Sequence, residues 1–146
     1  MPTLYTIGYS ERSLSDFIRT LQQAGVDAII DIRLLPSHEG AGYARQDDLA
    51  FLLREGFGIH FEHHAELAPT LEMLQQMHED HDWPRYVDCF TTLLAERPAL
   101  EAGRQVLARY RAPCLLCFED SAEQCHRRLV AEHWAAHLPG CTIVHL

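Results

Sequence analysis

The sequence predicts an α/β fold: a single three-layer domain over residues 1–146, with a mainly parallel sheet of about five strands and helices on both faces. Short β-rich segments alternate with segments of helical periodicity, which is the pattern of βαβ units. Residues 26–32 are almost continuously apolar, as expected for a strand buried on both faces of a parallel sheet. The 146 residues suffice for one hydrophobic core and contain no repeat or linker.

The expected elements follow from the apolar spacing and from the turn residues. We expect strands at residues 3–7, 26–32, 59–63, 114–118 and 142–145. We expect a first helix that begins at Ser13 and ends at Gly25, and further helices at residues 46–55, 71–78, 86–96, 99–110 and 122–137. Gly56 is expected to cap the second helix, and Trp83-Pro84 to break the helical pattern.

Composition restricts the class of protein. The formal net charge of −9 argues against non-specific nucleic-acid binding, which needs a surface that neutralises phosphates, although it leaves room for a local basic pocket. The five cysteines are odd in number and scattered, no charged leader opens the chain, and no apolar run approaches the roughly 20 residues of a membrane helix. We therefore expect a cytoplasmic protein with reduced thiols and no membrane contact.

The densest group of reactive side chains lies around the fourth predicted strand. Cys117 and Glu119 share one face at the end of this strand. The following helix start adds a thiol, an imidazole and two guanidinium groups: Cys125, His126, Arg127 and Arg128. In open α/β sheets ligands bind beyond the carboxyl ends of the strands, so this stretch is the expected centre of a site.

Other polar residues reach the same sheet edge from separate segments: Tyr9, Ser10 and Arg12; Asp31, Arg33, Ser37 and His38; and His63 and His64. Asp31 and Arg33 are two residues apart and share one face. They either pair with each other and order the loop, or Arg33 captures a phosphate or carboxylate. We predict Ser10, Asp31, Arg33, Ser37 and Arg127 as ligand-binding residues, and a small anionic ligand as the partner.

The cysteine and the histidine at the helix start each have two interpretations. Unsatisfied N–H groups in a first helical turn, with basic neighbours, favour the thiolate of Cys125 and would make it a nucleophile. It could equally be a small core thiol. His126 falls near the centre of the apolar stripe of its helix and points towards the sheet, either as a core histidine or as a site residue. Arg127 lies at the edge of this stripe, within reach of the site, whereas Arg128 points away.

Several familiar motifs are absent or misplaced. Cys114-x-x-Cys117 lies in a strand, where residues three apart point to opposite faces, and no second pair completes a zinc site. We therefore predict no metal ligand from this pair. Neither G-x-G-x-x-G after the first strand nor a P-loop is present, which argues against NAD and ATP bound in the usual ways. No cofactor is assigned.

Taken together, several motifs resemble one known family. Thr6-Ile7-Gly8-Tyr9-Ser10, Asp31-Ile32-Arg33 with Pro36-Ser37, Leu116 to Glu119, Cys125-His126-Arg127 and Val144-His145 are similar to motifs of the small prokaryotic proteins of domain-of-unknown-function family 488. The resemblance implies a compact α/β fold and a shared polar site, but no particular reaction. Two positions depart from the family pattern: His38 replaces a basic residue, and Leu67-Ala68 replaces a Leu-Gly step.

Three functions remain open on these residues. In an enzyme on a phosphate- or sulfur-containing substrate, Cys125 would be the nucleophile, His126 or Glu119 the proton carrier, and Arg33 with Arg127 an anion clamp. The Cys-x5-Arg spacing of cysteine phosphatases is absent. A non-catalytic module would use the same arginines to hold a nucleotide, a phosphorylated metabolite or a nucleic-acid end. A metal-dependent hydrolase would take its ligands from Cys117, Glu119, Cys125 and His126.

Overall fold

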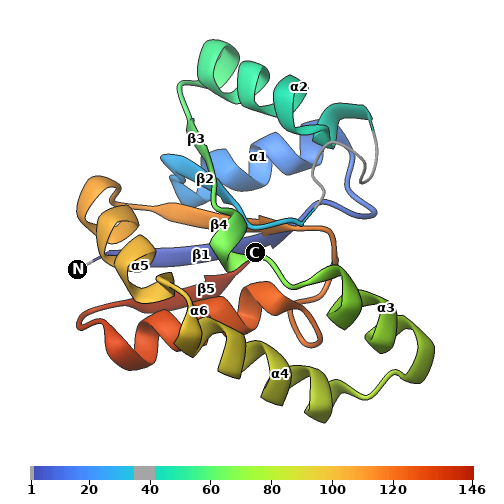
Figure 1. Cartoon of the computed structure of the whole chain (residues 1–146). Helices are drawn as coiled ribbons and strands as arrows, with labels where there is room; N and C mark the ends of the chain where they lie inside the picture. Colours follow the sequence, from blue (N-terminus) through green and yellow to red (C-terminus); the bar gives the residue numbers. More distant parts are fainter. Residues whose placement is uncertain (1, 35–41) are drawn as a thin grey trace.

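The computed structural model describes residues 2–34 and 42–146, which form one five-stranded sheet with helices on both faces (Figure 1). The strand order is β3-β2-β4-β1-β5, and all four neighbouring pairs are parallel. The strands are β1 (Thr3–Gly8), β2 (Ala28–Asp31), β3 (His60–His63), β4 (Pro113–Cys117) and β5 (Thr142–His145). The predicted three-layer α/β fold is therefore confirmed.

The helices form two layers that enclose the sheet. One face carries α1 (Leu14–Ala24) and α2 (Gln46–Phe51), which continues as a π-helical turn (Leu52–Gly56). The opposite face carries α4 (Trp83–Glu96), α5 (Ala99–Arg109) and α6 (His126–His137), with α3 (Leu71–Asp80) beside α4. The short 3-10 turns are Gly42–Ala44 and Ala65–Leu67. No helix among the described residues is both long and apolar enough to cross a membrane.

Side chains of β4 alternate between these two layers. Cys114 and Leu116 belong to the core on the α1 side, whereas Leu115 belongs to the core on the α6 side. Cys117, two residues beyond Leu115, lies on the α6 side, within 3.2 Å of the Arg127 side chain. The expectation that Cys114 and Cys117 point to opposite faces is therefore confirmed, and these two sulfurs cannot share one metal ion.

Chain topology selects one place along the carboxyl edge of the sheet. From β1 the chain crosses to β2 through α1 on one face, and from β4 it crosses to β5 through α6 on the other face. Because β1 and β4 are neighbours, these connections diverge where their carboxyl ends meet. Such a switch point is the usual ligand position in open α/β sheets, and Cys117 to His126 are located here.

Three predicted boundaries were wrong, each for a local reason. Trp83-Pro84 begins α4 instead of breaking a helix, because a proline in the first turn gives up only an N–H that has no helical partner. Gly56 lies within the π-helical turn, and the glycine with a left-handed backbone is Gly58 (φ 65°). Helix α6 begins at His126, not near Ala122, and Cys125 is its extended N-cap residue (φ −130°, ψ 141°).

At the end of β1, Gly8 allows an unusually close approach of the turn that follows β4. A Cβ atom on Gly8 would lie 1.6 Å from the carbonyl oxygen of Glu119 and 2.8 Å from Nη1 of Arg127. The backbone continues to pair beyond this point, since the N–H of Tyr9 donates to the Cys117 carbonyl (3.2 Å) and the N–H of Ser10 to the Phe118 carbonyl (3.1 Å). Only glycine fits here.

We predict that Gly8→Ala lowers the free energy of unfolding by at least about 2 kcal/mol, because the new methyl group overlaps backbone that cannot move cheaply. Urea denaturation followed by circular dichroism measures this change. Gly56→Ala is the matched control: its Cβ would meet nothing closer than 3.5 Å, so we expect a change within about 0.5 kcal/mol. Equal losses in the two variants would contradict the proposed contact.

Candidate functional site

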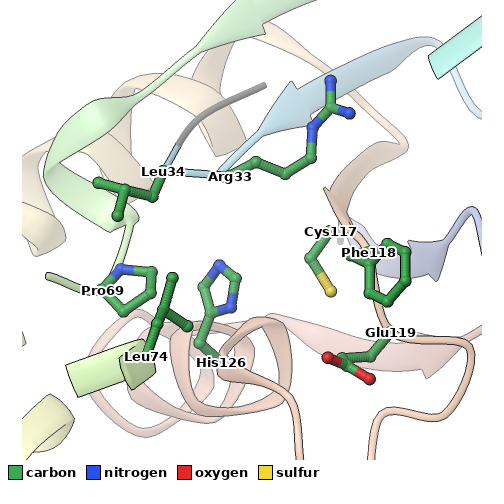
Figure 2. Close-up of a pocket in the computed structure, with 8 residues that line it drawn as sticks. All are labelled: Arg33, Leu34, Pro69, Leu74, Cys117, Phe118, Glu119 and His126. Carbon is green, nitrogen blue, oxygen red and sulfur yellow. The ribbon is translucent and has the colours of Figure 1, made fainter. Parts of the chain in front are cut away.

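A cavity of about 290 Å³ opens at the carboxyl edge of the sheet (Figure 2). It is lined by Arg33, Leu34, Pro69, Leu74, Cys117, Phe118, Glu119 and His126. A neighbouring cavity of about 490 Å³ shares Leu74, Glu119 and His126 with the first and adds Cys125 to its lining. Cys117 thus borders one cavity and Cys125 the other, while Glu119 and His126 border both.

Between the two cavities, the sulfur atoms of Cys117 and Cys125 are in contact. Both side chains are almost fully buried, with 1% and 2% exposure. Their Cα atoms are 7.8 Å apart, wider than the range of about 4.4–6.8 Å that is usual for disulfides, so a relaxed disulfide would require the backbone to move. The two sulfurs and a ring nitrogen of His126 all lie within 4.8 Å of one another.

The guanidinium group of Arg127 binds both sulfurs from the protein interior. Arg127 is fully buried, and its Nη1 donates to Sγ of Cys117 (3.2 Å) and faces Sγ of Cys125 (3.8 Å). It also donates to the carbonyl oxygens of Glu119 and Asp120. Among the described residues, no carboxylate forms an ion pair with this guanidinium. The sulfurs are therefore the groups in contact with it that can carry negative charge.

A second set of hydrogen bonds connects Arg127 to the last strand. Its Nε–H donates to Oγ1 of Thr6 (3.1 Å), and Thr6 Oγ1 lies 2.6 Å from Nδ1 of His145. Because the hydroxyl oxygen of Thr6 already accepts from arginine, its one hydrogen is free to point to His145. Burial lowers the pKa of His145, and in the neutral tautomer with its hydrogen on Nε2 the ring accepts this hydrogen at Nδ1. Neither Thr6 nor His145 was among the predicted site residues, although both lie in the motifs that carry the family resemblance.

The imidazole of His126 is held in one tautomer. Its Nε2 lies 2.8 Å from the carbonyl oxygen of Ile32, an atom that can only accept, so Nε2 carries the hydrogen and Nδ1 keeps a lone pair. Burial lowers the pKa of His126 to about 4, and the imidazole is therefore neutral near pH 7. Figure 2 shows this ring and the sulfur of Cys117 on facing sides of the cavity.

Arg33 does not present its charge to the cavity. Its Nε and Nη2 donate to the two carboxylate oxygens of Asp31 (2.9 and 2.8 Å), and Nη1 donates to the carbonyl oxygen of Ala44 (2.7 Å). The guanidinium also stacks over the ring of Tyr9, 5.2 Å from its centroid. Arg33 is 1% exposed, and its side chain turns away from the cavity (Figure 2). This geometry supports the loop-ordering ion pair rather than anion capture.

The remaining predicted residues are distributed around this centre. Glu119 is exposed and borders both cavities. Ser10 lines a separate hollow with Asp120, and Ser37 and His38 lie outside the described residues.

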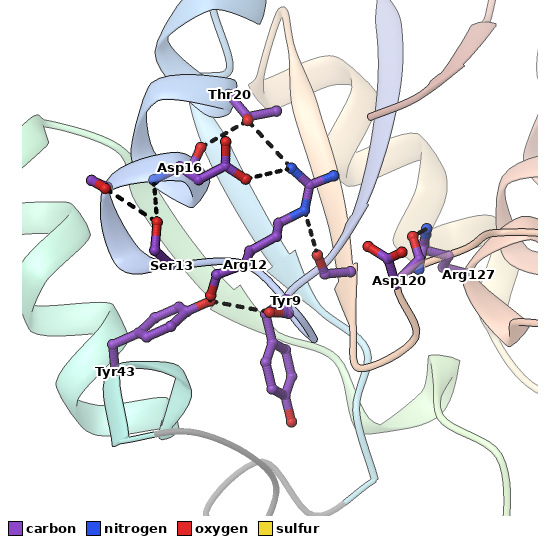
Figure 3. A network of polar contacts seen from close by, with 10 residues as sticks. Tyr9, Arg12, Ser13, Asp16, Thr20, Tyr43, Asp120 and Arg127 are labelled. Carbon is purple, nitrogen blue, oxygen red and sulfur yellow. Dashed lines mark hydrogen bonds and ion pairs between the residues drawn. The ribbon is translucent and has the colours of Figure 1, made fainter.

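Arg12 supports the end of β1: it donates to the Gly8 carbonyl (3.0 Å) and to side chains of α1, in a network beside Asp120 and Arg127 (Figure 3). Arg128 is partly exposed and pairs with Glu132, on the side of the helix away from the site, as expected.

The comparisons with known proteins identify a family and name no reaction. Residues 13–134 match the model of a family described as domain of unknown function DUF488. This span includes Cys117, Cys125, His126 and Arg127. Neither the curated proteins nor the solved structures contain a match to the chain.

We predict that Asp31→Asn lowers the free energy of unfolding by about 3–5 kcal/mol, because it leaves the buried charge of Arg33 without its partner. Replacing both members of the pair by apolar residues should restore much of this loss. Chemical denaturation of the single and double variants measures both effects. The exposed Arg128–Glu132 pair is the control, since Glu132→Gln should cost no more than about 0.5 kcal/mol.

Stability should also depend on the protonation of His126. In the unfolded chain its pKa is about 6.5, whereas burial lowers the pKa in the folded protein to about 4. The unfolded state therefore binds the proton more readily, and this contribution to stability is full above pH 6.5 and lost as the pH falls to 4. We expect a loss of about 3 kcal/mol across this window in the presence of a chelator.

The difference between variants isolates this effect. His126→Asn should remove most of the pH dependence between pH 6.5 and 4, whereas His137→Asn, on the exposed face of the same helix, should retain it. His133 and His145 add a common background, because burial lowers the pKa of each. If wild type and His126→Asn show the same slope, the neutral buried imidazole is not present.

Proposed function

The chain belongs to the DUF488 family, and we propose that it is a cysteine-dependent enzyme. In this proposal the thiolates of Cys117 and Cys125 carry the chemistry, on a small substrate that enters the adjoining cavities. The observation on which the proposal depends is the environment of Arg127. A cytoplasmic location fits it, because the cytosol keeps thiols reduced.

Charge balance is the first argument for thiolates. Burying a guanidinium without an anion is costly, and the fully buried Arg127 contacts two sulfurs and pairs with no carboxylate among residues 2–34 and 42–146. A cation in contact with a cysteine stabilises the thiolate, which is the reactive form of the residue. Two ordinary core thiols would leave this charge without compensation.

The position of Cys125 is the second argument. As the N-cap residue of α6 it precedes the free N–H groups of the first helical turn, where the helix dipole favours negative charge. The side chain of Cys125 makes no N-cap hydrogen bond of its own, and its sulfur borders the larger cavity. The thiolate is therefore stabilised from two directions and lies beside a cavity that could hold a small molecule.

Proton transfer falls to Glu119 in this proposal. His126 is neutral near pH 7 and its Nε2–H is engaged with Ile32, so it cannot serve as a general acid there. Glu119 is exposed and borders both cavities, from which its carboxylate can accept a proton and return it. The lining formed by Leu34, Pro69, Leu74 and Phe118 favours a largely apolar substrate with one electrophilic group.

Phosphate-containing substrates and a purely anion-binding module have less support. Both depend on Arg33 and Arg127 as a clamp, and the guanidinium groups of both residues are engaged inside the protein. The same holds for a nucleic-acid end. A small electrophile that reacts at the two sulfurs fits the residues that do line the cavities, namely Cys117, Cys125 and Glu119.

We predict that the alkylation of Cys125 and Cys117 by iodoacetamide persists to a pH about 1–3 units below that at which exposed Cys89 stops reacting. Peptide mass spectrometry of the reduced, chelator-treated protein gives each rate against pH. Burial raises the pKa of the Cys114 thiol, which therefore serves as the unreactive buried control. Alkaline midpoints for both cysteines would contradict the proposal.

Activity is tested on a panel of activated esters and thioesters. Cys117→Ser and Cys125→Ser should each remove turnover, whereas Cys89→Ser should retain it, because Cys89 is exposed on α4 and does not border these two cavities. Circular dichroism confirms that each variant is folded. Unchanged turnover in a folded Cys125→Ser variant would contradict a role for this thiolate.

A further inference from the structure

We propose that Cys117, Cys125 and His126 form a mononuclear site for a borderline-soft divalent metal ion of the zinc type, with one coordination position open to the cavity. The inference rests on the proposed function, because the ligands include the same two thiolates. It goes further by assigning a cofactor class and a reaction class. Four features of the cluster support it.

The size of the cluster suits one tetrahedral ion. Zinc binds thiolate at about 2.3 Å and imidazole at about 2.0 Å, which places neighbouring ligand atoms roughly 3.5–3.8 Å apart. The two sulfurs and a ring nitrogen of His126 all lie within 4.8 Å of one another, and the sulfurs, which are in contact, would move apart to this spacing around the ion. They come from two fixed positions, the last residue of β4 and the start of α6.

Donor type selects the metal. Two thiolates and an imidazole favour zinc or a similar ion and disfavour magnesium and calcium, which take oxygen ligands. The two thiolates offset two of the three positive charges of the ion and Arg127, and the carboxylate of Glu119, which borders the same cavity, supplies the third negative charge. Arg127 would keep its contacts with the two sulfurs, and these contacts would hold the ligands in their orientation around the ion.

His126 is arranged as a metal-binding histidine usually is. Such residues donate one ring N–H to a carbonyl or carboxylate, which fixes the tautomer and directs the other nitrogen to the metal. The carbonyl of Ile32 accepts from Nε2 at 2.8 Å, so Nδ1 is the nitrogen with a lone pair for the ion.

Three protein ligands with an accessible side indicate a catalytic rather than a structural site, since structural zinc sites are closed by four ligands. Cys117 and His126 both border the cavity into which the Glu119 side chain projects (Figure 2). The open position would hold a water molecule. The reaction class is therefore hydrolysis of an ester-like or amide-like bond.

The step balances without a further reagent. Metal-bound water gives one proton to the carboxylate of Glu119, and the resulting hydroxide forms a bond to the electrophilic carbon of the substrate. The bond from that carbon to the leaving group breaks, and the leaving group takes the proton from Glu119. The products are a carboxylic acid and an alcohol or amine, and Glu119 returns to its initial state.

Metal binding is tested on the full chain, reduced and freed of metal with a chelator. Titration with Zn²⁺ against a chromophoric chelator, and with Co²⁺ followed by absorption, should give one ion per chain and a sulfur-to-cobalt charge-transfer band with tetrahedral d–d bands. Cys117→Ser, Cys125→Ser and His126→Gln should each weaken binding at least about tenfold. Cys89→Ser and His137→Gln are matched controls that should bind as wild type does.

Two further measurements do not require ligand variants to fold. X-ray absorption of the zinc-loaded wild type should show two sulfur ligands, and absence of stoichiometric metal or of sulfur in its first shell would overturn the site. Glu119→Gln should keep metal uptake and lower ester hydrolysis by about 10²–10⁴-fold. Unchanged hydrolysis in this variant would overturn the assigned reaction.

The outcomes separate this inference from the proposed function. Low-pH alkylation of Cys125 in a protein that takes up no metal would overturn the metal site and leave the cysteine-dependent enzyme standing. The opposite result is zinc bound through sulfur in a protein whose thiols, once the metal is removed, alkylate only at alkaline pH. This result would support the metal site and overturn the claim that Arg127 alone stabilises the thiolates.

Discussion

The buried guanidinium of Arg127 joins the parts of the site that are distant in sequence. It binds Thr6 in β1, the backbone of the turn after β4, and the sulfurs of Cys117 and Cys125. A cation with this little access to water holds its surroundings in place, because each lost acceptor exposes an uncompensated donor. The close approach of the turn to Gly8 follows from the same contact, since the carbonyl that accepts from Arg127 is the one that excludes a side chain there.

Two buried arginines therefore have different tasks at this sheet edge. Arg33 has a carboxylate partner, Asp31, in bidentate geometry, and its charge is neutralised within its own loop. Arg127 has no such partner among the described residues, and its charge is left for the two sulfurs. The first arrangement needs nothing from a ligand or a metal. The buried charge of Arg127 is stabilised only if the sulfurs carry negative charge. For this reason the reactive centre is assigned to Cys117 and Cys125 and not to Arg33.

Much of the fold could be predicted from sequence because strand and helix periodicities are local properties of the chain. The site could be predicted only in part. Cys117, Glu119, Cys125 and His126 are close in sequence at a sheet edge, so their proximity was foreseeable. The contact between the two sulfurs could not be predicted, because it depends on how residues 118–124 fold back before α6 begins. The choice between ion pair and anion clamp for Arg33 depends on a side-chain rotation that no residue pattern encodes.

The roles of Thr6 and His145 show a further limit, because they depend on the direction of single hydrogen bonds. Thr6 accepts from Arg127 and so directs its own hydrogen to Nδ1 of His145. Strand β5 thus helps to hold Arg127 in place, although His145 lines neither of the two cavities. Pairing of β5 with β1 is therefore part of the construction of the site, and the final residues of the chain contribute to it through the sheet.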